Sequence, residues 1–183
     1  TYHHTILVSN MAEEAAERIG ADGLLTRVGT YYHDIGKTAR PYFFTENRAG
    51  SVNPHERLDP QTSAQIILGH VHDGLDLANK YRLPAAVRAF IPEHHGTGIT
   101  LAFYRMAVAQ AGDNGDSVDK DAFRYPGPKP QSRETAITML ADSAEARVRS
   151  AEPKSVEEMD RIIGEAIKSR LDEGQLDESS LTL

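Results

Sequence analysis

The sequence predicts an all-α protein, a helical bundle interrupted by two long loops. Apolar residues recur at the three- and four-residue spacing of amphipathic helices along most of the chain. Glycine and proline instead gather in residues 38–60 and 113–131. Hydrophobic residues make up 39% of the 183 residues, so the chain can bury a core of its own. We therefore expect one domain at 1–174, followed by a flexible tail at 175–183.

The first half of the chain divides into two helices and a loop. A helix is predicted at about 2–19, where apolar residues form one stripe. Gly20 and Gly23 separate it from a second helix at about 23–37. Residues 38–60 form the first long loop, and a loop of this length in a compact domain is usually functional.

Three further helices and the second loop follow. A third helix is predicted at about 61–81 from its alanine, isoleucine, leucine and valine face. Pro84 suits the first turn of a fourth helix that runs to about His95. A fifth helix is expected at 101–112, before the proline-rich loop at 113–131.

The last two helices carry capping signals. Ser132 is expected to cap a helix that runs to about Ser150. Ser155 opens the last helix, at about 155–174, and Glu158 three residues later completes a capping-box pattern.

Composition excludes several classes of function. The chain has no cysteine, which excludes disulfides and thiolate metal sites. Its net charge of −7 argues against binding a nucleic-acid polymer. No apolar run is long enough to span a membrane. Because the chain starts at Thr1 without a methionine, we expect it to be a fragment of a longer protein that includes a membrane region.

Histidines and aspartates occur in a regular order on successive predicted helices. Burying these side chains costs several kcal/mol unless they are paired or bind a metal. A lone buried histidine is more often a hydrogen-bonded core residue, so the ordered set supports the metal hypothesis better than any single member. Nitrogen-rich sets with carboxylates suit Fe, Mn or Zn. The set consists of His4, His33, Asp34, His70, His94, His95 and Asp142.

The motifs around these residues, from Thr1 to about Ser150, resemble a known family. The chain is similar to the HD-domain phosphohydrolases, specifically the branch carried by seven-transmembrane HD proteins of the PgpH type. The motifs are Thr1-Tyr2-His3-His4, Tyr32-His33-Asp34-Ile35-Gly36-Lys37, Arg40-Pro41-Tyr42-Phe43-Phe44, Asn53-Pro54-His55, Gly69-His70-Val71, His94-His95-Gly96-Thr97, Phe123-Arg124-Tyr125-Pro126-Gly127-Pro128-Lys129-Pro130 and Met139-Leu140-Ala141-Asp142-Ser143.

The resemblance implies an HD-domain helical bundle with two adjacent divalent transition-metal ions, most often Fe or Mn, in a metal core at 1–150. His3 and His4 compete as the first ligand, and His4 is preferred because it lies on the buried stripe. One metal would be held by His4, His33, Asp34 and Asp142. The second would be held by His70, His94 and His95, with Asp34 as the bridge.

The expected chemistry is hydrolysis at phosphorus. Two metals can bind a bridging hydroxide, lower its pKa and stabilise both oxygens of an in-line displacement. Asp34 is expected to be catalytic as the bridge, and Lys37 as a cation near the phosphate. The alternative for Lys37 is a solvated lysine at a helix end.

The two loops are expected to form the mouth of the substrate site. Aromatic rings stack on bases, and arginine binds phosphate through paired hydrogen bonds. The alternative is that the aromatic residues only anchor their loops. The candidate substrate-binding residues are Arg40, Tyr42, His55, Arg124 and Tyr125.

By resemblance, the function is hydrolysis of cyclic di-AMP to pApA by a cytoplasmic domain tethered to a transmembrane region. A homodimer is possible on the sequence alone. The HD-GYP type of cyclic di-GMP phosphodiesterase is disfavoured, because Gly96-Thr97-Gly98-Ile99 follows the His94-His95 pair instead of a Gly-Tyr-Pro triplet. Another HD nucleotide phosphohydrolase and a non-catalytic, metal-bearing nucleotide sensor are further alternatives.

Overall fold

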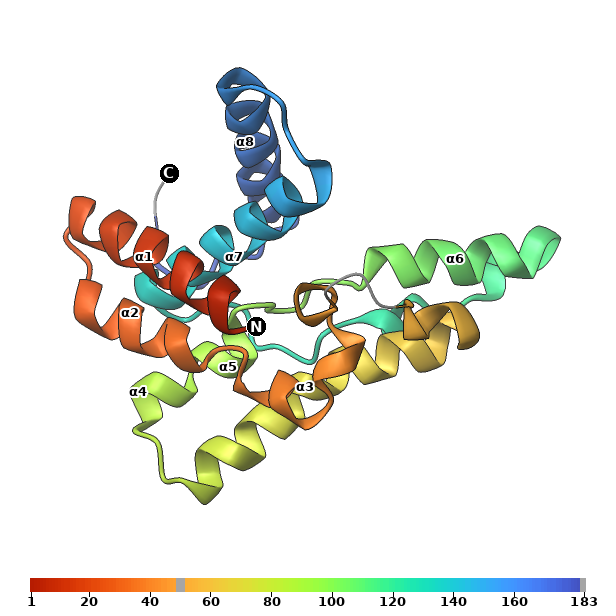
Figure 1. Cartoon of the computed structure of the whole chain (residues 1–183), viewed down its shortest axis with the longest axis horizontal. Helices are drawn as coiled ribbons and strands as arrows, with labels where there is room; N and C mark the ends of the chain where they lie inside the picture. Colours follow the sequence, from red (N-terminus) through yellow and green to blue (C-terminus); the bar gives the residue numbers. More distant parts are fainter. Residues whose placement is uncertain (49–51, 182–183) are drawn as a thin grey trace.

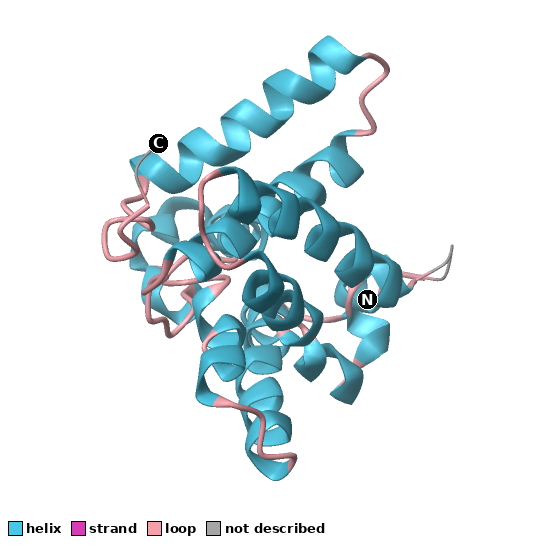
Figure 2. Cartoon of the chain, turned by 90° about the vertical axis from the view of Figure 1, so that its left-hand side faces the viewer, coloured by secondary structure: helices cyan, strands magenta, loops and turns pink. Residues whose placement is uncertain are grey.

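The computed structural model describes residues 1–48 and 52–181. Within these residues the chain forms eight α-helices joined by loops and 3-10 turns, with no β-strand (Figure 2), which confirms the all-α prediction. The helices are α1 (Tyr2–Arg18), α2 (Gly23–Tyr32), α3 (Pro60–Lys80), α4 (Ala85–Arg88), α5 (Phe90–Glu93), α6 (Leu101–Ala111), α7 (Arg133–Ala151) and α8 (Val156–Asp172).

Three helices from distant parts of the chain form one side of the bundle. Helices α1, α2 and α7 pack against one another, and α8 packs on α7 (Figure 1). Helix α3 lies across from them and contacts α5 and α6. A small apolar cluster of Ala12 and Ala16 of α1 with Ile137 of α7 packs the first of these layers together. The histidine–aspartate set comes from the elements that meet between the two layers.

The second helix ends earlier than predicted. It stops at Tyr32 instead of about residue 37, and Ile35–Ala39 form a 3-10 turn, η1. The tightening begins at His33, whose backbone N–H donates to the carbonyl of Thr30, three residues back. Asp34 and Lys37 therefore lie outside the helix, and η1 packs on α3.

The predicted fourth helix is divided into α4 and α5, with the break at Ala89. Pro92 explains the weakness at this point, because it has no N–H to donate to the carbonyl of Arg88. His94 and His95 follow directly after α5, in a turn.

The long loops and the helix caps largely follow the prediction. The described part of 38–60 and the first part of 113–131, up to Phe123, contain short 3-10 turns, and 124–131 have no helix. Residues 49–51 of the first loop lie outside the described residues. Ser132 caps α7, and Ser155 caps α8. The Glu158 carboxylate accepts a hydrogen bond from the backbone N–H of Lys154 instead of closing the capping box on Ser155.

The expected flexible tail is packed as far as it is described. Leu176 is 4% exposed and lies in an apolar cluster with Ala136 and Met139 of α7. Gln175 bonds with Thr97, accepting from its backbone N–H (3.0 Å) and donating to its hydroxyl (3.1 Å). Residues 175–181 therefore pack against the bundle, while the flexibility of the tail stays a prediction. Residues 182–183 lie outside the described residues. None of the described helices has the length and apolar character needed to cross a membrane.

Gly36 allows the close approach of η1 to α3. A Cβ atom added there would overlap the carbonyl oxygen of His70 and the backbone nitrogen of Gly74, and neither backbone atom can move aside cheaply. Gly164, on exposed α8, has open space around the same position.

We expect Gly36→Ala to lower the free energy of unfolding by about 1–3 kcal/mol through overpacking. Gly164→Ala, the matched control, should raise it by about 0.5–1 kcal/mol, because alanine favours a helix over glycine. Urea unfolding followed by circular dichroism measures both. Equal stability of the two variants would contradict the tight contact at Gly36.

Candidate metal centre

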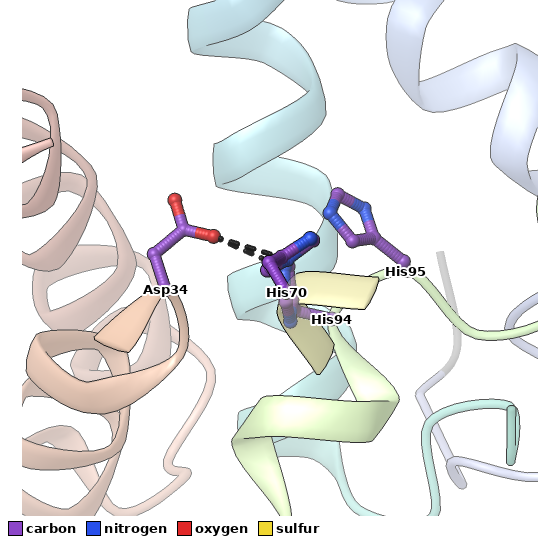
Figure 3. Close-up of side chains that lie close together, drawn as sticks. All are labelled: Asp34, His70, His94 and His95. Carbon is purple, nitrogen blue, oxygen red and sulfur yellow. Dashed lines mark ion pairs between the residues drawn. The ribbon is translucent and has the colours of Figure 1, made fainter. Parts of the chain in front are cut away.

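The Asp34 carboxylate lies at the centre of the site and is 1% exposed. Its two oxygens face two different pairs of histidines. Oδ2 lies 3.5 Å from Nε2 of His4 and 3.2 Å from Nε2 of His33. Oδ1 lies 3.4 Å from Nε2 of His70 and 3.5 Å from Nε2 of His94 (Figure 3). One carboxylate therefore joins two histidine groups that come from opposite layers of the bundle.

Each group extends to one further side chain. Asp142 of α7 places Oδ1 3.2 Å from Nε2 of His4 and 3.9 Å from Nε2 of His33. On the other side, one ligand atom each of Asp34, His70, His94 and His95 lie within 4.8 Å of one another. The structure thus brings the seven predicted ligands into two sets that share Asp34. His3 is exposed and belongs to neither set.

The orientation of three imidazoles is fixed by backbone carbonyls. A carbonyl can only accept, so Nδ1 of each ring carries the proton, and in the neutral ring Nε2 keeps its lone pair. These Nε2 atoms are buried and have no hydrogen-bond partner within the described part of the chain. Metal-ligating histidines are typically held in this way. The bonds run from His33 to Thr30 (2.6 Å), from His70 to Ile67 (2.6 Å) and from His94 to Ile91 (2.8 Å).

His4 is held by a carboxylate instead. Its Nδ1 lies 2.7 Å from Oε2 of Glu145, and Arg149 donates to both oxygens of Glu145, at 2.9 and 3.3 Å. We did not predict a role for Glu145 from the sequence. Its position three residues after Asp142 on the same helix was the available signal, because residues at that spacing share a face.

The electrostatics of the cluster suit divalent cations. Burial lowers the pKa of His70 to about 4 and holds the pKa of His95 well below its usual value, so both rings are neutral. Burial alone would raise the pKa of Asp34, but His33 and Lys37 hold it well below its usual value. Charged carboxylates and neutral imidazoles are the donor forms that metal binding requires.

His33 and His4 behave differently from His70 and His95. Burial lowers the pKa of His33, but the charge of Asp34 outweighs burial and raises it. The same balance is found at His4. Burial disfavours its charged form, but Asp142, Asp34 and Glu145 outweigh burial and raise its pKa to about 11. The carboxylates thus strongly favour a positive charge at this position. A proton on Nε2 and a metal ion would compete for the same lone pair, so metal binding would release this proton.

Lys37 belongs to the same cluster. Its ammonium lies 2.6 Å from Oδ2 of Asp34 and 2.8 Å from Oε1 of Glu46. Its side chain is 12% exposed, so it is not the solvated lysine considered as the alternative. Burial opposes its charge, but Asp34 and Glu46 raise its pKa. Nothing in the sequence pointed to Glu46, a single acidic residue in a long loop.

A hollow of about 500 Å³ adjoins the cluster. Glu46 and Phe44, which contact Lys37 and His70 respectively, belong to its wall. His55 also lines it and donates from Nε2 to the carbonyl of Phe43 (3.0 Å). Of the predicted substrate-binding residues, His55 therefore lies at this hollow.

The other predicted substrate-binding residues are spread more widely. The Tyr125 ring is buried and stacks on His95, with centroids 4.1 Å apart. Arg124 donates to the carbonyl of Thr97 (2.9 Å). Arg40 is exposed and pairs with Asp73, while Tyr42 is exposed and donates to the carbonyl of Val52 (2.9 Å). Neither Arg40 nor Tyr42 lines the hollow.

Comparison with known proteins finds matches over most or all of the chain. The model of the HD domain family matches residues 1–147. The chain is 44% identical over its full length to the cyclic-di-AMP phosphodiesterase PgpH of Bacillus subtilis, and 42% identical to PgpH of Listeria monocytogenes. It spans about a quarter of the length of these curated relatives.

Solved structures give the same result. The chain resembles the crystal structure of the Listeria monocytogenes PgpH HD domain in complex with cyclic-di-AMP, with a TM-score of 0.94 and 42% identity. All of this chain and 83% of that chain are covered. A second crystal structure of the Listeria monocytogenes PgpH HD domain matches with a TM-score of 0.91 and 42% identity.

Because Glu145 contacts Nδ1 of His4 and so orients the ring, loss of the Glu145 carboxylate should weaken metal binding at Nε2. We expect Glu145→Gln to lower the affinity for one of two metal ions by about 10- to 100-fold. Competition with a chromogenic chelator measures this affinity without any substrate. Glu157→Gln, at an exposed position on α8, is the matched control and should leave both affinities unchanged. Equal affinities in the two variants would contradict the orienting role.

Proposed function

The chain belongs to the HD domain family, and we propose that it is a metal-dependent phosphodiesterase that hydrolyses cyclic di-AMP to the linear dinucleotide pApA. One observation supports this best: the buried Asp34 carboxylate presents one oxygen to each of two histidine pairs. The fold around it is that of a domain solved with cyclic-di-AMP. The chain's own net charge of −7 favours a small anion held locally over a nucleic-acid polymer.

Two divalent metal ions fit the donor atoms described above. Fe and Mn suit imidazole and carboxylate ligands, and they are our proposal for the pair. When bound, they would supply a water of lowered pKa and positive charge at both reacting oxygens of an in-line displacement. The first ion would be held by His4, His33, Asp34 and Asp142. The second would be held by His70, His94, His95 and the shared Asp34.

Lys37 would act on the phosphate directly. Asp34 and Glu46 hold its ammonium beside the shared carboxylate, and its raised pKa keeps it charged. A fixed cation in a site from which water is largely excluded stabilises developing negative charge without reorganisation. Glu46 would keep Nζ in position while Asp34 is engaged by the metals.

The hollow beside the cluster would take part of the nucleotide. Its wall carries Phe43, Phe103 and His55, whose rings offer edges and faces to an adenine. Arg48 and Arg149 line the same hollow and would attract the ribose-phosphate backbone. On the other side of the cluster, Tyr125 would support the substrate only through His95, on which it stacks.

We also propose that this domain is the cytoplasmic part of a membrane-anchored protein. The support is that the chain spans about a quarter of its PgpH relatives, together with the resemblance described above. The membrane region would then lie outside this chain.

The first test is turnover of cyclic di-AMP by the Mn- or Fe-loaded protein, with cyclic di-GMP and a deoxynucleotide triphosphate alongside. We expect cleavage of cyclic di-AMP to pApA. Asp34→Asn should reduce the rate by at least about 1000-fold, because the bridge between the two metals is lost. Product chromatography measures both. Faster cleavage of cyclic di-GMP would assign the chain to another branch of HD enzymes, and tight nucleotide binding without any cleavage would make it a sensor.

Lys37→Gln tests the cation beside the bridge. We expect kcat to fall by about 100-fold or more, with KM changed only a few-fold, because the charge acts mainly in the transition state. Metal content, measured by elemental analysis, should stay at two ions. Lys168→Gln, on the exposed face of α8, is the control. Equal loss of activity in both variants, or a lower metal content in Lys37→Gln, would contradict the proposed role.

A further inference from the structure

A second hollow, of about 520 Å³, lies where α7 and α8 meet the start of α6 and the second long loop. Basic side chains dominate its lining. Five cationic residues face it against one carboxylate, Glu173, although the whole chain carries a net charge of −7. The five are Lys120, Arg124, Lys129, Arg147 and Arg170. The hollow is lined by neither the metal ligands nor Lys37.

Polar contacts hold two of the arginines in place. Arg124 donates to Oδ1 of Asp121 (2.8 Å) and to the carbonyl of Thr97 (2.9 Å). Arg170 donates from Nε to Oγ of Ser143 (3.0 Å) and from a terminal nitrogen to Glu173 (2.9 Å). These bonds fix the position of each guanidinium and leave further N–H groups for a ligand.

The other three cationic side chains have weaker carboxylate partners or none. Lys129 lies 3.7 Å from a carboxylate oxygen of Asp177. Arg147 and Lys120 pair with no carboxylate in the described part of the chain. Like charges gathered around one hollow repel each other, and a bound anion removes that repulsion.

We propose that this hollow binds the phosphate of a nucleotide, at a site separate from the metal centre. Guanidinium groups bind phosphate oxygens through paired hydrogen bonds, and the adjoining Ile99 and Leu101 offer apolar surface to an attached sugar or base. Part of the wall, including Arg170 and Gln175, lies beyond the residues 1–147 that the HD family model matches. The site therefore goes beyond the proposed function of the HD core.

The hollow is connected to the metal centre by two short paths. Arg170 bonds to Ser143, the residue after Asp142. Arg124 donates to the carbonyl of Thr97, two residues after His95. The next residue after Arg124, Tyr125, stacks on the His95 ring. The phosphate would come either from the same substrate that occupies the metal centre or from a separate nucleotide that acts on it.

The test compares Arg147→Glu with Arg105→Glu, a control on α6 that is exposed and lines neither hollow. Both are made in the Asp34→Asn chain, in which phosphate binding at the metal centre is impaired. The probe is adenosine 5′-monophosphate, and calorimetry measures its Kd. We expect Asp34→Asn to keep binding the probe, Arg147→Glu to weaken it by about tenfold or more, and Arg105→Glu to change it less than about twofold.

Kinetics of the metal-loaded chain then identify the source of the phosphate. If Arg147→Glu raises KM for cyclic di-AMP and leaves kcat unchanged, the site holds a second phosphate of the substrate. If KM is unchanged and the monophosphate alters the rate without competing, the site holds a separate nucleotide. Either result supports the site.

Two results would overturn it: loss of all monophosphate binding in Asp34→Asn, or equal effects of the two arginine substitutions. If Asp34→Asn does not fold, the comparison is made on the metal-loaded chain. Arg147→Glu should then remove one of two monophosphate sites, and an unchanged stoichiometry counts against the proposal.

Discussion

The buried Asp34 carboxylate is the constraint on which the rest of this structure depends. A charge that is 1% exposed is costly unless cations or strong donors surround it. Lys37 supplies one cation from the next turn of the chain, and the metal ions proposed between Asp34 and the imidazoles of both layers would supply the others. Side chains from α1, α3 and the turns after α2 and α5 must therefore meet at one point, which constrains how the layers pack.

Several departures from ideal helix geometry follow from this constraint. The chain leaves the α-helix at Tyr32, so that Asp34 is carried toward α3. It approaches α3 so closely that only glycine fits at position 36. On the other side of the site, Pro92 weakens the helix just before His94 and His95. Local rules are commonly broken at functional sites, and here each break moves a candidate ligand.

The sequence predicted most of the helices, because helical periodicity shows which faces are buried. The residues that it offered as metal ligands lie close together in the structure. It misplaced the end of α2, since the apolar spacing of Tyr32 and Ile35 suits an α-helix and a 3-10 turn equally. It missed Glu46 and Glu145, because a single acidic residue normally marks a solvated face. Both owe their role to partners far away in the sequence, Lys37 across a loop and His4 across the bundle. Such long-range pairing leaves no periodic trace in one sequence.

Helix α7 unites the two candidate sites. Asp142, Glu145 and Arg149 lie at the three- and four-residue spacing of one face, which is directed toward His4 and the first hollow. Ser143 and Arg147, four residues apart, lie on the neighbouring face, which α8 covers to form the basic hollow. A rotation of α7 by a small angle would disturb both faces together, because the helix is rigid along its length. A phosphate bound on one face would thus restrict the same helix that carries a carboxylate of the metal centre on the other. This would give α8 a role in the chemistry, although it contributes none of the candidate ligands.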